Sequence, residues 1–171
     1  DVLVEVHHNG SKAVYQYVKP NMVPRIVQEH LVGGSPVKEW LADDAYDAFY
    51  KKQIKVVLGD CGRIDPEDIN AYMAVGGYEA ARDVLNKWYP EEVIEEMKMS
   101  GLRGRGGAGF PTGLKWELGR KSPGEVKYLI CNADEGDPGA FMDRAVIEGN
   151  PHSVIEGMII GAYALCAHHG Y

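Results

Sequence analysis

A glycine-rich stretch contains the residue types that could bind a ligand through the backbone. Seven of the 21 glycines lie between Gly101 and Gly119, and a bare backbone of this kind allows close approach. Within it, Gly104–Gly109, here called the glycine loop, fits the pattern G-x-G-x-x-G, whose N–H groups bind a pyrophosphate at a helix start. Three cations surround it: Arg103, Arg105 and Lys115. The pattern predicts contact with a planar, anionic ligand.

The glycine loop does not fit the two common nucleotide-binding turns. A Rossmann turn needs a strand directly before the glycines and a helix directly after them, whereas a helix is expected before this loop and Phe110–Gly113 follows it. A Walker loop ends in Gly-Lys-Ser/Thr, which is absent here. A plain glycine-rich connection between two helices is the alternative. It does not explain so many small residues beside three cations, and we favour the ligand-binding interpretation.

A second polar stretch follows a β-prone run. Val126–Cys131 predicts a buried strand, and Asn132–Gly139, here called the acidic turn, is expected to leave its C-terminal end. Ligands bind at such strand ends in α/β sheets. The polar residues of the turn are Asn132, Asp134, Glu135 and Asp137, which could accept hydrogen bonds from ribose, amide or ring N–H donors. An exposed turn without a ligand and a Ca²⁺ or Mg²⁺ site are alternatives, but EF-hand spacing is absent, so metal ranks below a ligand contact.

Helices are expected to position both segments. Apolar residues at helical spacing predict three helices before the glycine loop, within residues 66–76, 78–88 and 90–101. Asn150 and Pro151 are a good N-cap and first position for a final helix. That helix has little polar surface, so we expect it to be buried, with Gly157 and Gly161 allowing a neighbour to approach closely.

The first residues predict a small separate unit. Apolar alternation on either side of a polar turn predicts a β-hairpin within residues 2–18, and Val23–Leu31 predicts a short amphipathic helix. Ile54–Leu58 predicts a short strand in an otherwise polar segment. The expected organisation is a unit over residues 1–41, a linker with a short strand over 42–65, and the main domain over 66–171.

Composition excludes several classes of protein. The 171 residues carry a net charge of −7, which argues against a nucleic-acid binder. Cys61, Cys131 and Cys166 form no C-x-x-C pair, so neither a disulfide framework nor a closed zinc site is expected. No apolar run reaches 18 residues, so no membrane span is expected. A cytoplasmic protein, peripheral to a membrane if part of a complex, is the expectation.

Three runs of residues closely resemble one protein family. They are GLRGRGGAGFPTGLKW from Gly101, YLICNADEGDPGAFMDR from Tyr128 and PHSVIEGMIIGAYA from Pro151. The family is the flavin- and NADH-binding F-type subunit of respiratory complex I, which also occurs in NAD(P)-linked and electron-bifurcating hydrogenases and in NAD-dependent formate dehydrogenases. The resemblance extends back through DPEDINAYMAVGGYEAARDVL, so residues 64–171 are similar to the first part of that subunit's core.

The resemblance extends to the first 41 residues in a different way. They are similar to the second half of the thioredoxin-like [2Fe-2S] domain that precedes the core in hydrogenase-type versions, so the fusion favours that type. The cluster cysteines of that domain, the family's later flavin segment and its [4Fe-4S] cysteine motif are not in this chain, which is therefore expected to be the N-terminal part of a subunit. The expected fold class is α/β, a partial thioredoxin-like unit followed by a helical lead-in and the first part of an FMN-binding α/β domain.

The resemblance implies roles for individual residues. FMN contacts would come from Gly104, Gly106, Lys115, Asn132, Asp134 and Glu135. The segment 103–110 would border the dinucleotide, with Phe110 stacking on adenine. Asp137, where many members have Glu, would lie beside the nicotinamide, and Leu118 stands where some members have an aromatic residue. The expected cofactor-binding set is Gly104, Arg105, Gly106, Gly107, Gly109, Phe110, Lys115, Asn132, Asp134, Glu135 and Asp137, with no catalytic side chain and no metal ligand.

The implied function is that of an oxidoreductase subunit. Hydride would pass from NADH or NADPH to FMN, and single electrons would pass onward to iron–sulfur clusters that this chain does not ligate. Expected partners are NAD(P)H and the iron–sulfur subunits of a multi-subunit redox complex, without nucleic acid and without direct membrane insertion. The alternative is a non-catalytic scaffold or assembly module that binds no cofactor by itself. A nicotinamide dehydrogenase without flavin is more remote, because no strand precedes the glycine loop.

Overall fold

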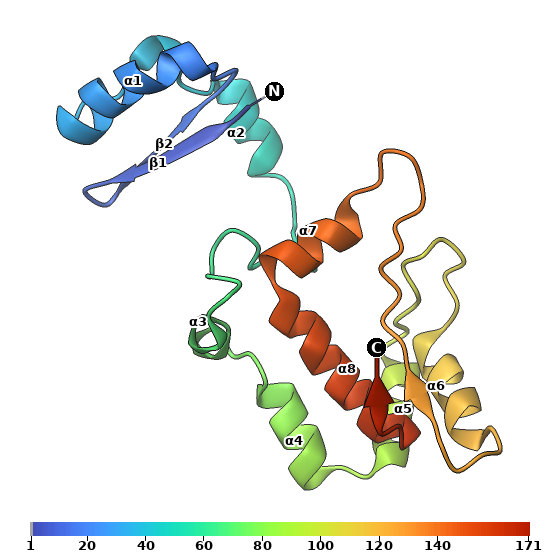
Figure 1. Cartoon of the computed structure of the whole chain (residues 1–171). Helices are drawn as coiled ribbons and strands as arrows, with labels where there is room; N and C mark the ends of the chain where they lie inside the picture. Colours follow the sequence, from blue (N-terminus) through green and yellow to red (C-terminus); the bar gives the residue numbers. More distant parts are fainter. Residues whose placement is uncertain (1) are drawn as a thin grey trace. The chain divides into compact units, whose positions relative to one another are not determined.

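The computed structural model describes residues 2–171, and the chain forms two compact units. The first unit ends at Ile54, and the second runs from Lys55 to Tyr171. Each unit contains one short two-stranded sheet, and helices make up about half of the second unit (Figure 1). Within residues 2–171, no helix has both the length and the apolar character that crossing a bilayer requires.

The first unit contains the predicted β-hairpin. Strand β1 (Val4–His8) pairs antiparallel with β2 (Ser11–Tyr15), so that Val4 lies opposite Tyr15. Asn9 and Gly10 connect the strands with positive φ angles of 49° and 76°, which is the backbone of a type I′ turn. The Asn-Gly pair therefore fixes the register that puts Val6 and Tyr15 in the core.

The predicted helix of the first unit covers one face of this hairpin core. Helix α1 (Val23–Ile26) continues directly into the π-helical segment η2 (Val27–Val32), which ends before Gly33. The Nδ1 atom of buried His30 and the Tyr15 hydroxyl share a 2.8 Å hydrogen bond. The same hydroxyl accepts the Val37 N–H at 3.1 Å. The remaining elements of this unit are η1 (Pro20–Met22), η3 (Lys38–Trp40) and α2 (Asp44–Tyr50).

The expected strand over Ile54–Leu58 is not formed, and this prediction was wrong. The segment has turns and irregular backbone, with Ile54 92% and Val56 85% exposed. A β-prone run becomes a strand only where a neighbouring strand supplies hydrogen-bond partners, and neither sheet of the described residues reaches this segment.

The second unit is built around one long helix, α8 (Pro151–Leu165), which packs against four other helices and both strands. Its other elements are α3 (Ile69–Ala74), α4 (Glu79–Lys87), α5 (Pro90–Met99), α6 (Thr112–Lys121), β3 (Tyr128–Leu129), α7 (Met142–Gly149) and β4 (His169–Gly170). The three predicted helices before the glycine loop are α3, α4 and α5. Val93, Ile94 and Ala164 form the buried core between α5 and α8. Helix α7 was not predicted.

The predicted buried strand is shorter and more exposed than expected. Only Tyr128–Leu129 is a strand, paired in parallel with His169–Gly170. Leu129 faces α8, whereas Tyr128 and Ile130 on the other face are 56% and 71% exposed. The correction has a physical reason: one strand neighbour and one covering helix bury only alternate residues of a strand.

The two glycines of α8 differ in what surrounds them. A Cβ on Gly161 would lie 3.1 Å from the Trp116 ring, so the close approach expected there is confirmed. Gly157 faces open space, so the same expectation was wrong for it. The expected burial of α8 is only partial: Glu156, Gly161 and Ala164 are buried, Ile155 is 45% exposed, and most other residues of the helix are half-buried.

Candidate functional site

The glycine loop is held closed at its base by backbone pairing between the segment that follows α5 and the residues at the start of α6. The Gly104 N–H donates to the Phe110 carbonyl at 2.9 Å, and the Thr112 N–H donates to the Leu102 carbonyl at 2.9 Å. The Arg103 guanidinium adds a third link, a 3.0 Å hydrogen bond to the Gly109 carbonyl. The two ends of the loop are therefore fixed while its tip projects outward.

The tip of the glycine loop leaves a run of backbone donors without protein partners. Among the described residues, the N–H groups of residues 105–109 donate to no acceptor. Consecutive N–H groups in a loop of this kind form a concave site for an anion. The Arg105 side chain folds back onto the Arg103 carbonyl at 2.7 Å and, like Lys115, forms no ion pair with any described residue.

Backbone conformation requires glycine at some positions of this loop but not at Gly106. Gly107 and Gly109 have φ angles of 96° and 61°, a conformation that side chains disfavour. Gly106 has no such angle, and a Cβ there would meet no atom within 4 Å. Neither conformation nor packing within the chain explains the absence of a side chain at Gly106, which leaves open space against bare backbone.

Helix α6 begins directly after the loop and carries Lys115 in its first turns. Its positive N-terminal end therefore lies at the base of the loop. Gly113 holds α6 against α5, because a Cβ there would lie 2.5 Å from the Lys98 backbone nitrogen. Phe110, 46% exposed, stands where the loop enters α6, and Lys115 and Leu118 are exposed on the helix. The sequence patterns did not predict the structural role of Gly113.

The acidic turn has one carboxylate with protein partners and two without. The Glu135 carboxylate accepts the Asp143 N–H at 2.7 Å and the Arg144 N–H at 3.0 Å, both at the start of α7. The Asn132 side-chain oxygen accepts the Asp134 N–H at 3.1 Å. Asp134 and Asp137 are exposed, and their carboxylates accept no hydrogen bond from a described residue.

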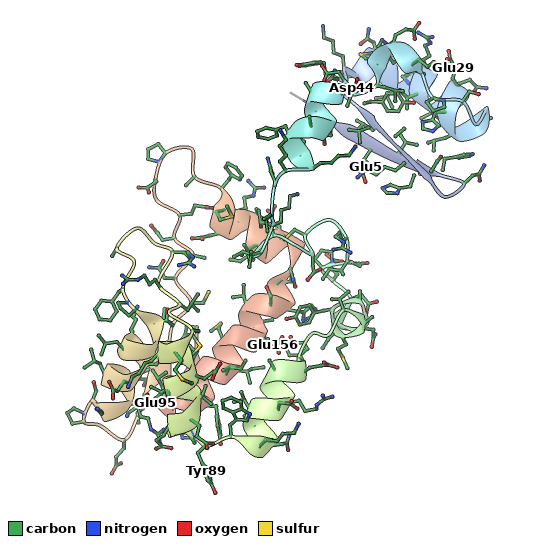
Figure 2. The ribbon with its side chains drawn as sticks, turned by 180° about the vertical axis from the view of Figure 1, so that it is seen from behind. Glu5, Glu29, Asp44, Tyr89, Glu95 and Glu156 are labelled. Carbon is green, nitrogen blue, oxygen red and sulfur yellow. The ribbon has the colours of Figure 1, made fainter. Side chains whose placement is uncertain are left out.

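The structure brings the predicted residues into two groups. Gly104, Arg105, Gly106, Gly107, Gly109, Phe110 and Lys115 lie on the glycine loop and α6, and Asn132, Asp134, Glu135 and Asp137 lie on the acidic turn. Both segments extend from the same end of the second unit (Figures 1 and 2). Within residues 2–171, no hydrogen bond or ion pair joins the two groups, and no cluster of His, Cys, Asp and Glu could hold a metal ion.

A buried polar network on α8 was not singled out from the sequence. Glu156 is only 8% exposed and accepts hydrogen bonds from the Tyr72 hydroxyl at 2.5 Å, the Tyr78 N–H at 2.9 Å and the Ala81 N–H at 3.1 Å (Figure 2). His152 stacks on Tyr72 and hydrogen-bonds the Tyr78 hydroxyl at 2.9 Å. One glutamate inside an otherwise apolar helix was the signal that could have identified this network.

The network shifts the ionisation of its members. Burial raises the pKa of Glu156, but hydrogen bonds from Tyr72 and from the backbone at Tyr78 and Ala81 outweigh it and leave the pKa below its usual value. Burial, the hydrogen bond to Glu156 and its charge raise the pKa of Tyr72. The carboxylate is therefore held ionised while the phenol stays neutral, and together they fix α3 and α4 on α8.

Comparison with known proteins finds a family match toward the C-terminal end of the chain. Residues 97–171 match the family described as the Nuo51 FMN-binding domain. The chain is 56% identical over 120 residues to HndC, a component of the NADP-reducing hydrogenase of Solidesulfovibrio fructosivorans, covering 70% of this chain and 24% of that protein. It is 52% identical over 116 residues to the second F-type component of the NADH-quinone oxidoreductase of Rhizobium meliloti, covering 68% of this chain and 28% of that protein.

A solved structure supports the same relationship over more of the chain. The crystal structure of an air-oxidized NAD⁺-reducing [NiFe]-hydrogenase aligns with a TM-score of 0.52 and 26% sequence identity, covering 92% of this chain and 25% of that one. The chain thus spans about a quarter of the length of these relatives. The resemblance found in the sequence is confirmed: residues 97–171 match the family model of the Nuo51 FMN-binding domain, and the relatives are F-type and hydrogenase components.

Proposed function

We propose that this chain is part of an NAD(P)H-oxidising flavoprotein subunit, in which the glycine loop and the acidic turn contribute to the FMN and dinucleotide sites. One observation carries the proposal: five consecutive N–H groups, residues 105–109, have no acceptor among the described residues and lie on a backbone that is open at Gly106. The match of residues 97–171 to an FMN-binding domain supports the same assignment.

The glycine loop and α6 fit the anionic and planar parts of these ligands. The free N–H groups and the N-terminal end of α6 favour negative charge, and Arg105 and Lys115 add positive charge that no described carboxylate neutralises. Bare backbone at Gly104 and Gly106 allows a flat ring to approach, since a Cβ would otherwise separate them. The exposed Phe110 ring offers a surface for stacking on adenine.

The acidic turn fits the parts of the ligands that donate hydrogen bonds. Asp134 and Asp137 are acceptors without protein donors among the described residues, and Asn132 has an amide that can both donate and accept. Ribityl and ribose hydroxyls and ring N–H groups are donors of the matching kind. We assign Asp137 to the nicotinamide half of the dinucleotide and Asn132 and Asp134 to FMN.

The protein's task at such a site is to bind and orient. When bound, FMN takes a hydride from NAD(P)H and releases electrons one at a time, which is chemistry of the cofactor. The residues of this chain would hold the flavin between the loop and the turn and align the dinucleotide against it, without acting as nucleophile or general base. Iron–sulfur subunits of a multi-subunit redox complex would receive the electrons.

The direct test is to add a side chain at Gly106, where the backbone is open. Gly106→Val should lower FMN affinity at least about tenfold in the full-length protein, because the added side chain occupies the space left for the ligand. The fold should survive, since the chain itself has no atom within 4 Å of the new Cβ. Flavin absorbance per protein, after dialysis, measures the effect.

A matched control separates ligand exclusion from a general loss of stability. Gly157→Val adds the same side chain on α8, at a glycine that also faces open space, and should retain normal flavin content. Stoichiometric FMN and normal NADH oxidation in Gly106→Val would contradict the proposal. A wild-type protein that takes up no FMN would favour the scaffold alternative.

A further inference from the structure

Helix α7 begins without a cap of its own. Phe141 occupies the N-cap position, and its side chain makes no hydrogen bond to the helix. The N–H groups of the second and third helical residues, Asp143 and Arg144, would then lack acceptors, as they do at any uncapped helix start. The Glu135 carboxylate accepts both of them, from a position outside the helix.

The hydrogen bonds of Glu135 to α7 also constrain the acidic turn, to which Glu135 belongs. Glu135 has a φ of 50°, an unfavourable conformation for a residue with a side chain. The following residue is Gly136, where a Cβ would lie 2.8 Å from a carboxylate oxygen of Asp134. Charge-assisted hydrogen bonds to a helix N-terminus are strong enough to hold such a backbone. The acidic turn is thus fastened to α7 at Glu135.

The neighbouring carboxylates differ from Glu135 in this respect. Those of Asp134 and Asp137 have no protein donor among the described residues, whereas both oxygens of Glu135 are engaged. Three acidic residues that are equivalent by composition are therefore not equivalent by structure. Only two of them have both carboxylate oxygens available for a ligand.

We infer that Glu135 is a positioning residue, whose carboxylate caps α7 and fixes the acidic turn so that Asp134 and Asp137 face the ligands. The inference rests on the proposed function, because it assigns the ligand contacts of that same site. It changes the role that the family resemblance implied for Glu135, from direct contact with FMN to support of the residues on either side.

The test combines amide exchange with flavin binding in the full-length protein. In flavin-free protein, Glu135→Ala should speed exchange at Asp143 and Arg144 about tenfold, because the helix start loses its acceptors. Glu148→Ala is the matched control: it removes a carboxylate of the same helix that pairs with the Arg144 side chain and caps nothing. It should leave these two amides unchanged.

Rescue variants separate positioning from direct contact. Phe141→Asp places a cap at the N-cap position itself, so the double variant Glu135→Ala, Phe141→Asp should restore slow exchange at Asp143 and Arg144. It should also recover part of the flavin affinity lost in Glu135→Ala. Glu135→Gln, which keeps one acceptor oxygen, should lose less affinity than Glu135→Ala.

The outcomes distinguish this inference from the proposed function. Unchanged exchange at Asp143 and Arg144 in Glu135→Ala, with reduced flavin affinity, would show that Glu135 contacts the flavin directly and would overturn the inference. A restored cap without any recovery of affinity would also overturn it. If the wild-type protein bound no FMN while the exchange results held, the cap would stand and the proposed function would fail.

Discussion

Polar groups at the junction of α3, α4 and α8 have partners, whereas those at the tip of the glycine loop do not. Around Glu156, a buried carboxylate accepts one hydroxyl and two backbone N–H groups, and a histidine and two tyrosines complete the network. In the glycine loop, five consecutive N–H groups among the described residues have no acceptor. The two regions lie in the same compact unit.

This difference distinguishes the Glu156 network, which holds helices together, from the glycine loop, which is available to a ligand. A buried polar group without a partner is costly, so a satisfied network fixes how helices pack. An exposed donor without a partner is hydrated at little cost and is available to a ligand. Changes at Glu156 should therefore act on stability, and changes in the two loops should act on binding.

The largest effect is expected from Glu156→Ala. It leaves the Tyr72 hydroxyl and the Tyr78 and Ala81 N–H groups buried without an acceptor, which should lower the free energy of unfolding by about 3 kcal/mol. Denaturant titration of the chain measures it. Glu148→Ala, an exposed glutamate, should change stability by less than about 0.5 kcal/mol. A loss below about 1 kcal/mol in Glu156→Ala would mean that the network does not fix the helices.

The chain by itself should bind FMN at least about a hundredfold more weakly than the whole protein. A flavin site encloses most of its ligand, whereas the loop and the turn here are open on their outer sides, with Phe110 and Asp137 exposed. Titration followed by flavin fluorescence gives the two affinities. Equal affinities would show that the residues of this chain form a complete FMN site by themselves.

Acid should destabilise the scaffold through Glu156. Its pKa is lower in the folded protein than in the unfolded chain, so its contribution is full at neutral pH and is lost as the pH falls below about 4. Unfolding free energies of wild type and Glu156→Gln between about pH 7 and pH 3 test this. The wild type should lose its advantage over the variant toward low pH. Parallel curves would remove Glu156 from the acid response.

The smallest effect is expected at Asp137. Asp137→Asn should change the ratio of NADH to NADPH turnover several-fold, about 1 kcal/mol, with less change in flavin content, because we assign this charge to the nicotinamide half of the dinucleotide. Steady-state kinetics with both cofactors, against the exposed control Glu125→Gln, measure it. Lost flavin with an unchanged ratio would mean that the flavin and nicotinamide sides of the turn are exchanged.

Local patterns predicted the elements whose structure depends on near neighbours. Asn9-Gly10 specified the hairpin turn, and the spacing of apolar residues specified α4 and α5. The strand expected at Ile54–Leu58 failed, and the one at Val126–Cys131 was shortened, because strand formation depends on partners that are distant in sequence.

The partners of the two capping glutamates could not be predicted, although a lone glutamate in an apolar helix marked Glu156 as unusual. Glu156 accepts a hydrogen bond from Ala81 at the start of α4, 75 residues earlier in the chain. Glu135 caps α7 from the acidic turn and not from the N-cap position of the helix. A list of acidic residues cannot distinguish Glu135 from Asp134 and Asp137. The candidate site was predicted by residue type and motif, while the division of roles within it required the structure.

Amide exchange of the full-length protein with and without FMN tests the central distinction most directly. We predict that residues 105–109 exchange fast in the flavin-free protein and slowly with FMN bound. The N–H groups of Tyr78 and Ala81, which donate to Glu156, should be protected in both states. Fast exchange of residues 105–109 in protein that carries stoichiometric FMN would contradict the assignment of the glycine loop as a flavin site.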